Sequence, residues 1–292
     1  MQVSVIIPTF NRAETLPRAL ESVLAQKGMS FEVFIVDDGS TDGTQKLVEK
    51  IACGKPDIHY DFQANQGPSA ARNLGIKKAS SPFLAFLDSD DEWLPGKLKA
   101  QLDFFGENSD FLICQTKEIW IRSGKRVNLM KKHQKSGGDI FERSLKLSLV
   151  SPSSVMMRRE FFDRVGLFDE TLPVCEDYDL WLRASARFPI GLIKKPYVIK
   201  YGGHPDQRSR QFPVMDRYRI QALLKLFRSA DLSPEKKEKV ASELLRKCHI
   251  VSRGARKRGK LEEARFYEKI AKEVGTKEVG TVLEGTLSTF LD

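Results

Sequence analysis

The chain of 292 residues opens with short apolar segments that alternate with amphipathic segments as far as residue 87. The apolar segments, at residues 3–7, 31–36, 58–62 and 83–87, have the length and composition of strands buried on both faces of a sheet. The segments between them place apolar side chains at helical spacing, as Leu16, Leu20 and Val23 do. This βαβαβαβ order predicts an α/β fold: a parallel sheet with right-handed crossovers and helices on both faces.

Polar residues directly follow each predicted strand. In an open parallel sheet, ligands bind beyond the carboxyl ends of the strands, where the strand order reverses. Four separate loops that bring polar groups to one edge therefore predict a binding site there. The residues concerned are Thr9, Asn11 and Arg12; Asp37 and Asp38; Asn65 and Gly67; and Asp88 and Asp90.

The fourth strand ends in the acidic run 88–92. Side chains alternate along an extended chain, so Asp88 and Asp90 leave it on the same side. Two converging carboxylates repel each other unless a cation lies between them, and Mg²⁺ or Mn²⁺ bound to a substrate phosphate would fill that role. The alternative is an acidic turn that caps a helix starting near residue 94.

The second half of the chain adds two candidate site groups. Asp177 or Asp179 lies at the start of a helix whose Leu180, Trp181 and Ala184 face inward, so either could be a helix cap or a general base. His204 follows two glycines after a late strand, where it could be structural or could bind the same divalent ion. Further strands are expected at residues 111–121, 153–157 and 197–201.

From residue 213 onward the sequence is helical. We expect helices at residues 215–227, 234–251 and 261–274, with Gly254 and Gly259 separating the last two. The chain is therefore predicted to have a catalytic domain at residues 1–212 and a helical extension at residues 213–292.

Charge and composition limit the possible partners. The formal net charge is +9, and residues 246–260 carry basic side chains without an acidic one. This patch could meet nucleic acid, anionic lipid or an acidic glycan, or could be a solvated helix face. Aromatic residues are not interleaved with it, so no nucleic-acid partner is expected. Its basic residues are Arg246, Lys247, Arg253, Arg256, Lys257, Arg258 and Lys260.

The sequence lacks the usual signals of membrane-spanning segments, of cysteine metal sites and of two common nucleotide sites. No apolar run approaches the roughly 20 residues that cross a bilayer, and the four cysteines are scattered without paired metal spacing. We therefore expect a cytoplasmic protein, with possible peripheral contact at the inner face of the membrane through the basic C-terminal region. The Rossmann and Walker glycine motifs are absent from the sequence, which disfavours the corresponding nucleotide sites.

Taken together, these motifs resemble the family 2 glycosyltransferases with a GT-A fold. The resemblance covers roughly residues 2–211 and implies a Rossmann-like, mostly parallel sheet. It also implies that a sugar is transferred with inversion from a nucleotide-sugar donor, for which we expect a UDP-sugar. The implied acceptor is a glycan or is lipid-linked, and the implied process is polysaccharide or glycoconjugate synthesis. The motifs that carry it are the sequences at 3–12, 36–42, 65–67, 71–73, 86–91 and 176–179.

The same resemblance implies a role for each matching residue. Asp38 would hold the base, Asp90 would bind Mn²⁺ or Mg²⁺ directly, and Asp88 would lie nearer the ribose or sugar. Asp177 would be the catalytic base, with Glu176 as the second choice, and His204 would help to hold the metal or diphosphate. The full set of implied nucleotide-binding residues is Pro8, Thr9, Arg12, Asp38, Gly67, Arg72 and Ser89.

Two other functions remain open from the sequence. One is a nucleotidyltransferase-like enzyme that makes sugar nucleotides, although the Gly-rich triphosphate loop expected near Pro8 is missing. The other is a non-catalytic protein that binds anionic surfaces through the basic stretch, and its binding would weaken strongly with added salt.

Overall fold

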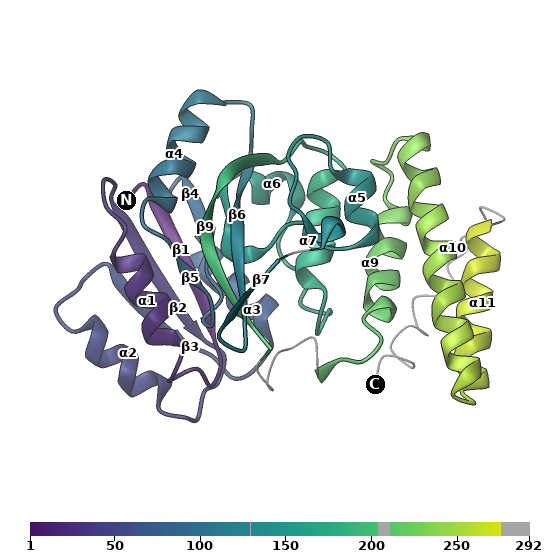
Figure 1. Cartoon of the computed structure of the whole chain (residues 1–292), viewed down its shortest axis with the longest axis horizontal. Coiled ribbons are helices and arrows are strands. Elements are labelled where there is room, and N and C mark those ends of the chain that lie inside the picture. The colour runs from purple at the N-terminus through teal and green to yellow at the C-terminus, as the bar shows by residue number, and fades with distance from the viewer. Residues whose placement is uncertain (129, 204–210, 276–292) are drawn as a thin grey trace.

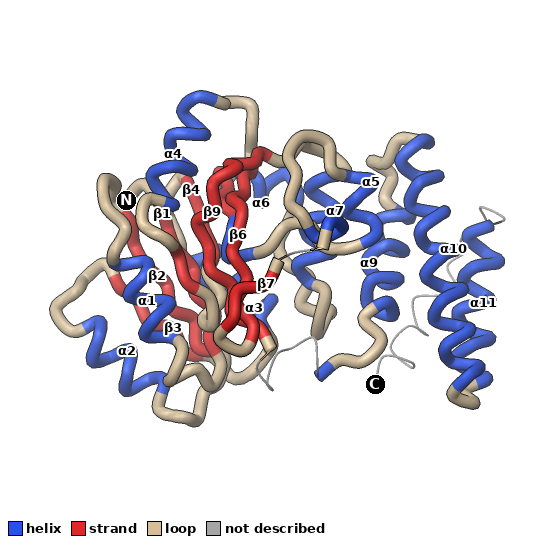
Figure 2. The backbone as a smooth tube through the Cα atoms, in the orientation of Figure 1, coloured by secondary structure: helices blue, strands red, loops and turns tan. Residues whose placement is uncertain are grey.

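The computed structural model describes residues 1–128, 130–203 and 211–275, and the remarks on structure concern these residues. His204 and the C-terminal apolar residues from Val279 lie outside them. Figure 2 shows one twisted sheet with helices around it. Its strands are β1 (Val3–Thr9), β2 (Phe31–Asp37), β3 (Ile58–Phe62), β4 (Phe83–Phe86), β5 (Glu92–Trp93), β6 (Ile113–Arg122), β7 (Lys125–Val127), β8 (Val155–Arg158) and β9 (Gly191–Gly202).

The strand order is β3-β2-β1-β4-β8-β6-β9-β5, and β7 pairs with β6. Strands β1, β2, β3, β4, β6 and β9 run in one direction, while β5, β7 and β8 run against them. The prediction of a mostly parallel sheet is therefore confirmed. The chain moves outward from β1 through β2 to β3 and then returns to the other side of β1 for β4, so the order reverses between β1 and β4. A ligand crevice is expected at the carboxyl ends of these two strands.

Most of the helices lie in intervals that the sequence predicts as helical, but the helix at residues 141–146 was not predicted. The helices are α1 (Leu16–Leu24), α2 (Thr44–Ala52), α3 (Pro68–Lys78), α4 (Lys97–Glu107), α5 (Phe141–Lys146), α6 (Glu160–Val165), α7 (Glu176–Ser185), α9 (Asp216–Arg228), α10 (Pro234–Lys257) and α11 (Leu261–Gly275), with short 3₁₀ turns η1 (Lys131–His133) and η2 (Pro152–Ser154). Within the described ranges, no helix combines the length and the apolar character needed to pass through a membrane.

Two apolar layers enclose the sheet because successive side chains point to opposite faces. Val5 and Ile7 of β1 pack with Leu20 of α1 and with α4. Ile6 points the other way and packs with α3, and the same layer includes Trp181 of α7. This sandwich fixes the strand ends in space and so fixes the loops that follow them.

Two details of the sequence prediction need correction. Its place before the helical segment 70–79 predicts Ser69 as a cap, but Gly67 occupies the cap position of α3 with φ 92° and Pro68 opens the helix. Proline suits that first turn, where its missing N–H would have no helical partner. Gly254 does not break the chain either, since α10 continues through it to Lys257 and the turn forms at Gly259 with φ 72°.

The C-terminal helices line up at one end of the molecule, away from β1–β3 (Figure 1). They do not form a separate core. Tyr218 and Leu223 of α9 belong to one buried cluster with Leu145 of α5 and Tyr178 of α7, and this cluster continues into α10 and α11. The division of the chain at residue 212 stays a prediction, although the packing runs across that position.

Candidate active site

One open cleft of about 960 Å³ lies at the carboxyl ends of β1 and β4. It brings together side chains far apart in the sequence, among them Asp38, Asp90 and Asp177. Gly67 is not among the lining residues, but its backbone N–H donates to Asp38 at 2.8 Å. The other predicted site residues that line the cleft are Pro8, Thr9, Arg12, Arg72, Asp88, Ser89 and Glu176.

Asp38 organises the loop on one side of the cleft. It is 4% exposed, and its carboxylate accepts hydrogen bonds from the side chain of Gln63 at 2.7 Å and from the backbone N–H of Gln66 at 2.8 Å. With the Gly67 N–H, three protein donors use most of the acceptor capacity of the carboxylate. One further donor, such as a base N–H, can still be accommodated, so loop support and base recognition are compatible.

A buried arginine joins two of the predicted acidic groups. Arg72 is 5% exposed, and its guanidinium donates to Asp88 at 2.9 Å and to Glu176 at 2.8 Å. Burial opposes the charge of Arg72, but Asp88 and Glu176 outweigh burial and raise the pKa of Arg72. The charged side chain of Arg72 thus links the loop after β4 to the start of α7.

Lys200 on β9 completes the charge balance around the acidic run, and sequence reasoning missed it. Its Nζ lies 2.8 Å from Asp91 and 3.5 Å from Asp88. Burial opposes the charge of Asp88, yet Lys200 and Arg72 lower the pKa of this carboxyl group. Burial also raises the pKa of Asp91 to about 7, while Lys200 acts in the opposite direction. Asp88 is therefore held between two protein cations. The prediction that Asp88 and Asp90 leave an extended chain on the same side is wrong, because residues 88–91 form a turn in which the Asp91 N–H donates to the Asp88 carbonyl at 2.9 Å.

The start of α7 places Asp177 in the cleft through an unusual backbone conformation. Cys175, directly before the helix, has φ 66°, a left-handed value that is uncommon for residues other than glycine. Asp177 is half-buried and accepts a hydrogen bond from the backbone N–H of Tyr178 at 2.7 Å. Burial raises the pKa of Asp177 to about 6, and the charge of Glu176 acts in the same direction. A carboxylate with such a pKa is suited to accept a proton near neutral pH.

The residues present fit a divalent ion only if a substrate supplies further ligands. Over residues 1–128, 130–203 and 211–275, no three His, Cys, Asp or Glu side chains are grouped closely enough to enclose a metal. Mg²⁺ in proteins is commonly held by one or two carboxylates together with substrate phosphates. Asp90 lines the cleft and could supply one such carboxylate. The Asp90 loop is fixed by Arg18, which donates to the Asp90 carbonyl at 2.6 Å and stacks 3.7 Å from the Tyr201 ring centroid.

Two more charged residues of the cleft had no sequence signal. Glu118 and Lys135 are 3.3 Å apart, with side chains only 6% and 4% exposed. Glu118 lies in the strand predicted at residues 111–121, and Lys135 lies in the polar segment that follows this strand. Their pairing depends on how β6 meets the segment after η1, which residue spacing does not reveal.

Comparison with known proteins relates this chain to glycosyltransferases. The family model for glycosyl transferase family 2 matches residues 4–166. An uncharacterized glycosyltransferase of Rickettsia felis is 37% identical over 201 residues, which are 66% of this chain and 32% of that protein. The succinoglycan biosynthesis protein ExoU of Rhizobium meliloti is 34% identical over 195 residues, covering 63% of this chain and 57% of ExoU.

Among solved structures, S. aureus TarS 1–349 in complex with UDP-GlcNAc matches with a TM-score of 0.64 and 20% identity, covering 95% of this chain and 93% of that one. This likeness shows a shared GT-A fold. The chain spans about a third of the length of the Rickettsia felis relative. The family model, in contrast, covers more than half of this chain, and the chain therefore belongs to glycosyl transferase family 2.

Proposed function

We propose that this chain transfers a sugar from a UDP-sugar to an acceptor hydroxyl and inverts the anomeric centre. The observation that carries the proposal is the meeting of Asp38, Asp90 and Asp177 in one cleft beyond β1 and β4. One cleft then offers a carboxylate for the nucleotide, a carboxylate for the metal and a carboxylate for the proton transfer. ExoU acts in polysaccharide synthesis by its name, and we propose the same class of product here.

The donor nucleotide would lie along the loops after β1 and β2. Asp38 would accept a base N–H at its remaining acceptor position, with Pro8, Thr9 and Arg12 beside it. The Thr9 hydroxyl and Arg72 Nε are buried without a hydrogen-bond partner among the described residues. Leaving such groups unpaired costs about 1–3 kcal/mol each. A site that gains partners when the donor binds would recover this energy.

The donor diphosphate would lie near Asp90. A divalent ion held by Asp90 and the phosphates would supply a Lewis acid that neutralises the charge of the leaving diphosphate. Asp88 takes a different part in this proposal, because Arg72 and Lys200 already hold it. It would orient the ribose or the sugar, while Arg72 adds a fixed positive charge to the donor side of the cleft.

Asp177 would take the proton from the acceptor hydroxyl. As this O–H bond breaks, the acceptor oxygen forms a bond to the anomeric carbon, and the bond from that carbon to the diphosphate oxygen breaks. Attack from the face opposite the leaving group inverts the carbon without a covalent enzyme intermediate. Glu176 is less suited to this task because Arg72 Nη1 binds its carboxylate at 2.8 Å.

Ser148 should tune the pH dependence of this step. Its hydroxyl lies 3.2 Å from Asp177 Oδ2 and 3.0 Å from the Val150 carbonyl, and the hydrogen bond to Asp177 lowers the pKa of that carboxyl. In Ser148→Ala the pKa should rise, and since only ionised Asp177 accepts a proton, the acidic limb of the rate profile should move to higher pH. Transfer should then fall more at pH 6 than at pH 8, measured as UDP release.

The matched control for this variant is Ser109→Ala, which removes an exposed hydroxyl far from the cleft. It should leave the profile unchanged. A Ser148→Ala profile that stays in place, or moves to lower pH, would show that this hydroxyl does not stabilise the ionised form of Asp177.

The helical extension carries a basic surface at the end of α10 that could bind a partner. The exposed residues Arg253, Arg256 and Lys257 lie near the end of α10, and Lys260 lies in the turn that follows. We propose that this end contacts an anionic surface, such as a membrane that carries a lipid-linked acceptor. Arg256 already pairs with Glu268 at 2.7 Å, so the contact would depend mainly on the other basic side chains.

The direct test of the function is a thermal melting screen with UDP-sugars, each with and without Mn²⁺. A true donor at a hundredfold excess over its Kd should raise the Tm by about 5 °C. GDP- and dTDP-sugars serve as comparisons, and UDP release then reports slow hydrolysis or transfer. The proposal fails if no nucleotide sugar stabilises the protein and none is consumed.

A further inference from the structure

A half-buried tryptophan held by a buried ion pair lies in the cleft beside the proposed catalytic residues. We propose that Trp120 is the floor of the acceptor subsite, where it packs against the ring of a saccharide, and that Glu118 and Lys135 hold it in place. This inference rests on the proposed transfer function and names the class of acceptor: the acceptor presents a sugar ring to the site. Nothing in the family match or the matched proteins assigns this role.

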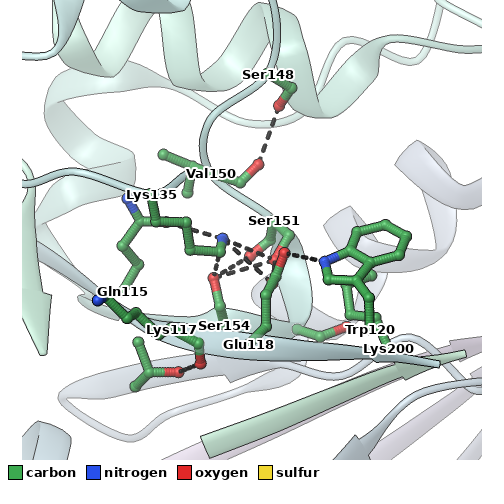
Figure 3. Close-up of polar contacts among 12 residues, drawn as sticks. Gln115, Lys117, Glu118, Trp120, Lys135, Ser148, Val150, Ser151, Ser154 and Lys200 are labelled. Carbon is green, nitrogen blue, oxygen red and sulfur yellow. Dashed lines mark hydrogen bonds and ion pairs between the residues drawn. The ribbon is translucent and has the colours of Figure 1, made fainter. Parts of the chain in front are cut away.

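The contacts among these residues form one connected set (Figure 3). The indole N–H of Trp120 donates to Glu118 Oε1 at 3.1 Å, and the Ser151 hydroxyl donates to Glu118 Oε2 at 2.7 Å. Lys135 Nζ lies 3.3 Å from Glu118 and also donates to Ser154 at 3.0 Å. Every oxygen of Glu118 thus has a protein partner, and the indole cannot rotate without losing one.

The burial of Glu118 and Lys135 has a cost in solvation free energy. Burying two charges loses solvation that their mutual attraction only partly replaces, so a buried ion pair is weak evidence for a gain in stability. Its clearer effect is to fix geometry. Here the geometry it fixes is the orientation of the Trp120 ring, together with Ser151 in the segment that leads to η2.

The position of Trp120 connects the donor and base sides of the cleft. Lys200 Nζ, which pairs with Asp88, lies 5.8 Å from the Trp120 ring centroid. Through Glu118, Trp120 is also linked to Ser151, and Ser148 of the same segment bonds to Asp177. A ring that packs on Trp120 would therefore lie in the cleft that also holds Asp88 and Asp177.

The chemistry of a sugar ring matches this surface. A pyranose has C–H groups on its faces and hydroxyls on its edge, so it packs flat on an aromatic ring while its edge makes hydrogen bonds. Asn128 and His133 line the same cleft and are exposed, and they can meet those hydroxyls. The neighbouring charges of Lys200 and Glu118 suit a polar ligand better than a lipid chain.

The three tryptophans allow a binding test that needs no turnover. Trp93 and Trp181 are 2% and 1% exposed, whereas Trp120 is partly exposed, so acrylamide should quench mainly the Trp120 fluorescence. We would titrate methyl glycosides, disaccharides and octyl glucoside into the full chain with UDP and Mn²⁺ present. At least one short saccharide should protect the exposed fluorescence in a saturable way. If no saccharide protects it, or only the octyl compound does, the inference is overturned.

Variants then link this binding to transfer. Trp120→Leu should raise the acceptor KM about tenfold, which corresponds to about 1.4 kcal/mol and lies in the range of one well-packed aromatic contact. Trp120→Phe, which keeps a flat ring, should lose less. Phe62→Ala removes an exposed aromatic outside the cleft and is the matched control. Circular dichroism and Tm monitor folding. An acceptor KM for Trp120→Leu within twofold of the parent overturns the inference. A failed donor function appears separately, as absent UDP-sugar binding in the parent protein.

Discussion

Asp177→Asn should lose sugar transfer by about a thousandfold while its UDP-sugar Kd stays within about threefold. Asparagine has nearly the same shape, but its amide cannot accept the acceptor proton. Asp177 lies at the start of α7 and shares no hydrogen-bond partner with Asp38 within the described part of the chain, so the change should leave the donor position undisturbed. UDP release with a saturating acceptor measures transfer, and isothermal titration calorimetry measures donor binding.

The pH dependence gives the same prediction an independent signature. In the parent protein, transfer should fall as the pH drops through about 6, because Asp177 becomes protonated there. Residual activity of Asp177→Asn should show no such limb. Melting curves on both proteins separate this effect from loss of the fold.

Two further variants make the assignment decisive. Asp103→Asn changes an exposed carboxylate paired with Lys99 outside the cleft, and it should transfer like the parent. Glu176→Gln tests the alternative base. If Glu176→Gln abolishes transfer with donor binding intact and Asp177→Asn does not, the base is Glu176. If donor binding and transfer fall together in Asp177→Asn, the residue has a structural role at the helix start.

The sequence predicted the carboxyl-end cleft well because its signals are local. Short apolar runs for the strands and a period of 3.6 for the helices gave the order of elements, and the polar residues after each strand followed directly from it. Asp38, Asp88 and Asp90 could thus be placed at one edge before any coordinates were known. The resemblance to a family added which carboxylate would take which role, and those roles stay predictions.

The cations around these carboxylates could not be predicted in the same way. Lys200 meets Asp91 across more than a hundred residues of sequence because β9 pairs with β5, the strand that directly follows Asp91. A lysine in a strand gives no sign of the partner it will have. The same holds for Lys135 and Glu118, whose pairing appears only once the segment after η1 packs against β6.

The C-terminal packing shows another limit of local patterns. Helix amphipathicity gave both ends of α9 and α11 to within one residue, and the start of α10, although α10 runs six residues beyond its predicted end at residue 251. It could not tell that Tyr218 and Leu223 would share a core with Tyr178 of α7. Since Tyr178 directly follows Asp177, the extension supports the helix that carries the proposed base. Removing residues 213–292 is therefore a poor way to test a separate role for them.

Asp90→Asn should remove the response of the enzyme to Mn²⁺ and lower transfer by about a hundredfold, since a Lewis acid at the leaving diphosphate is worth several kcal/mol. An amide oxygen is a weaker ligand than a carboxylate for a hard cation. The contact from Arg18 goes to the backbone carbonyl of Asp90, so this anchor of the loop is kept in the variant. The measurement is UDP release as a function of Mn²⁺ concentration.

Asp88→Asn is the informative comparison because its effect should be of a different kind. Asp88 neutralises the buried cations Arg72 and Lys200, and losing one partner of a buried pair costs about 3–5 kcal/mol. Asp88→Asn should therefore lower the Tm clearly, whereas Asp90→Asn should act on the metal response. Asp103→Asn again serves as the unaffected control. If chelation with EDTA leaves the parent enzyme fully active, or if Asp90→Asn keeps the Mn²⁺ response, then Asp90 does not hold a catalytic metal.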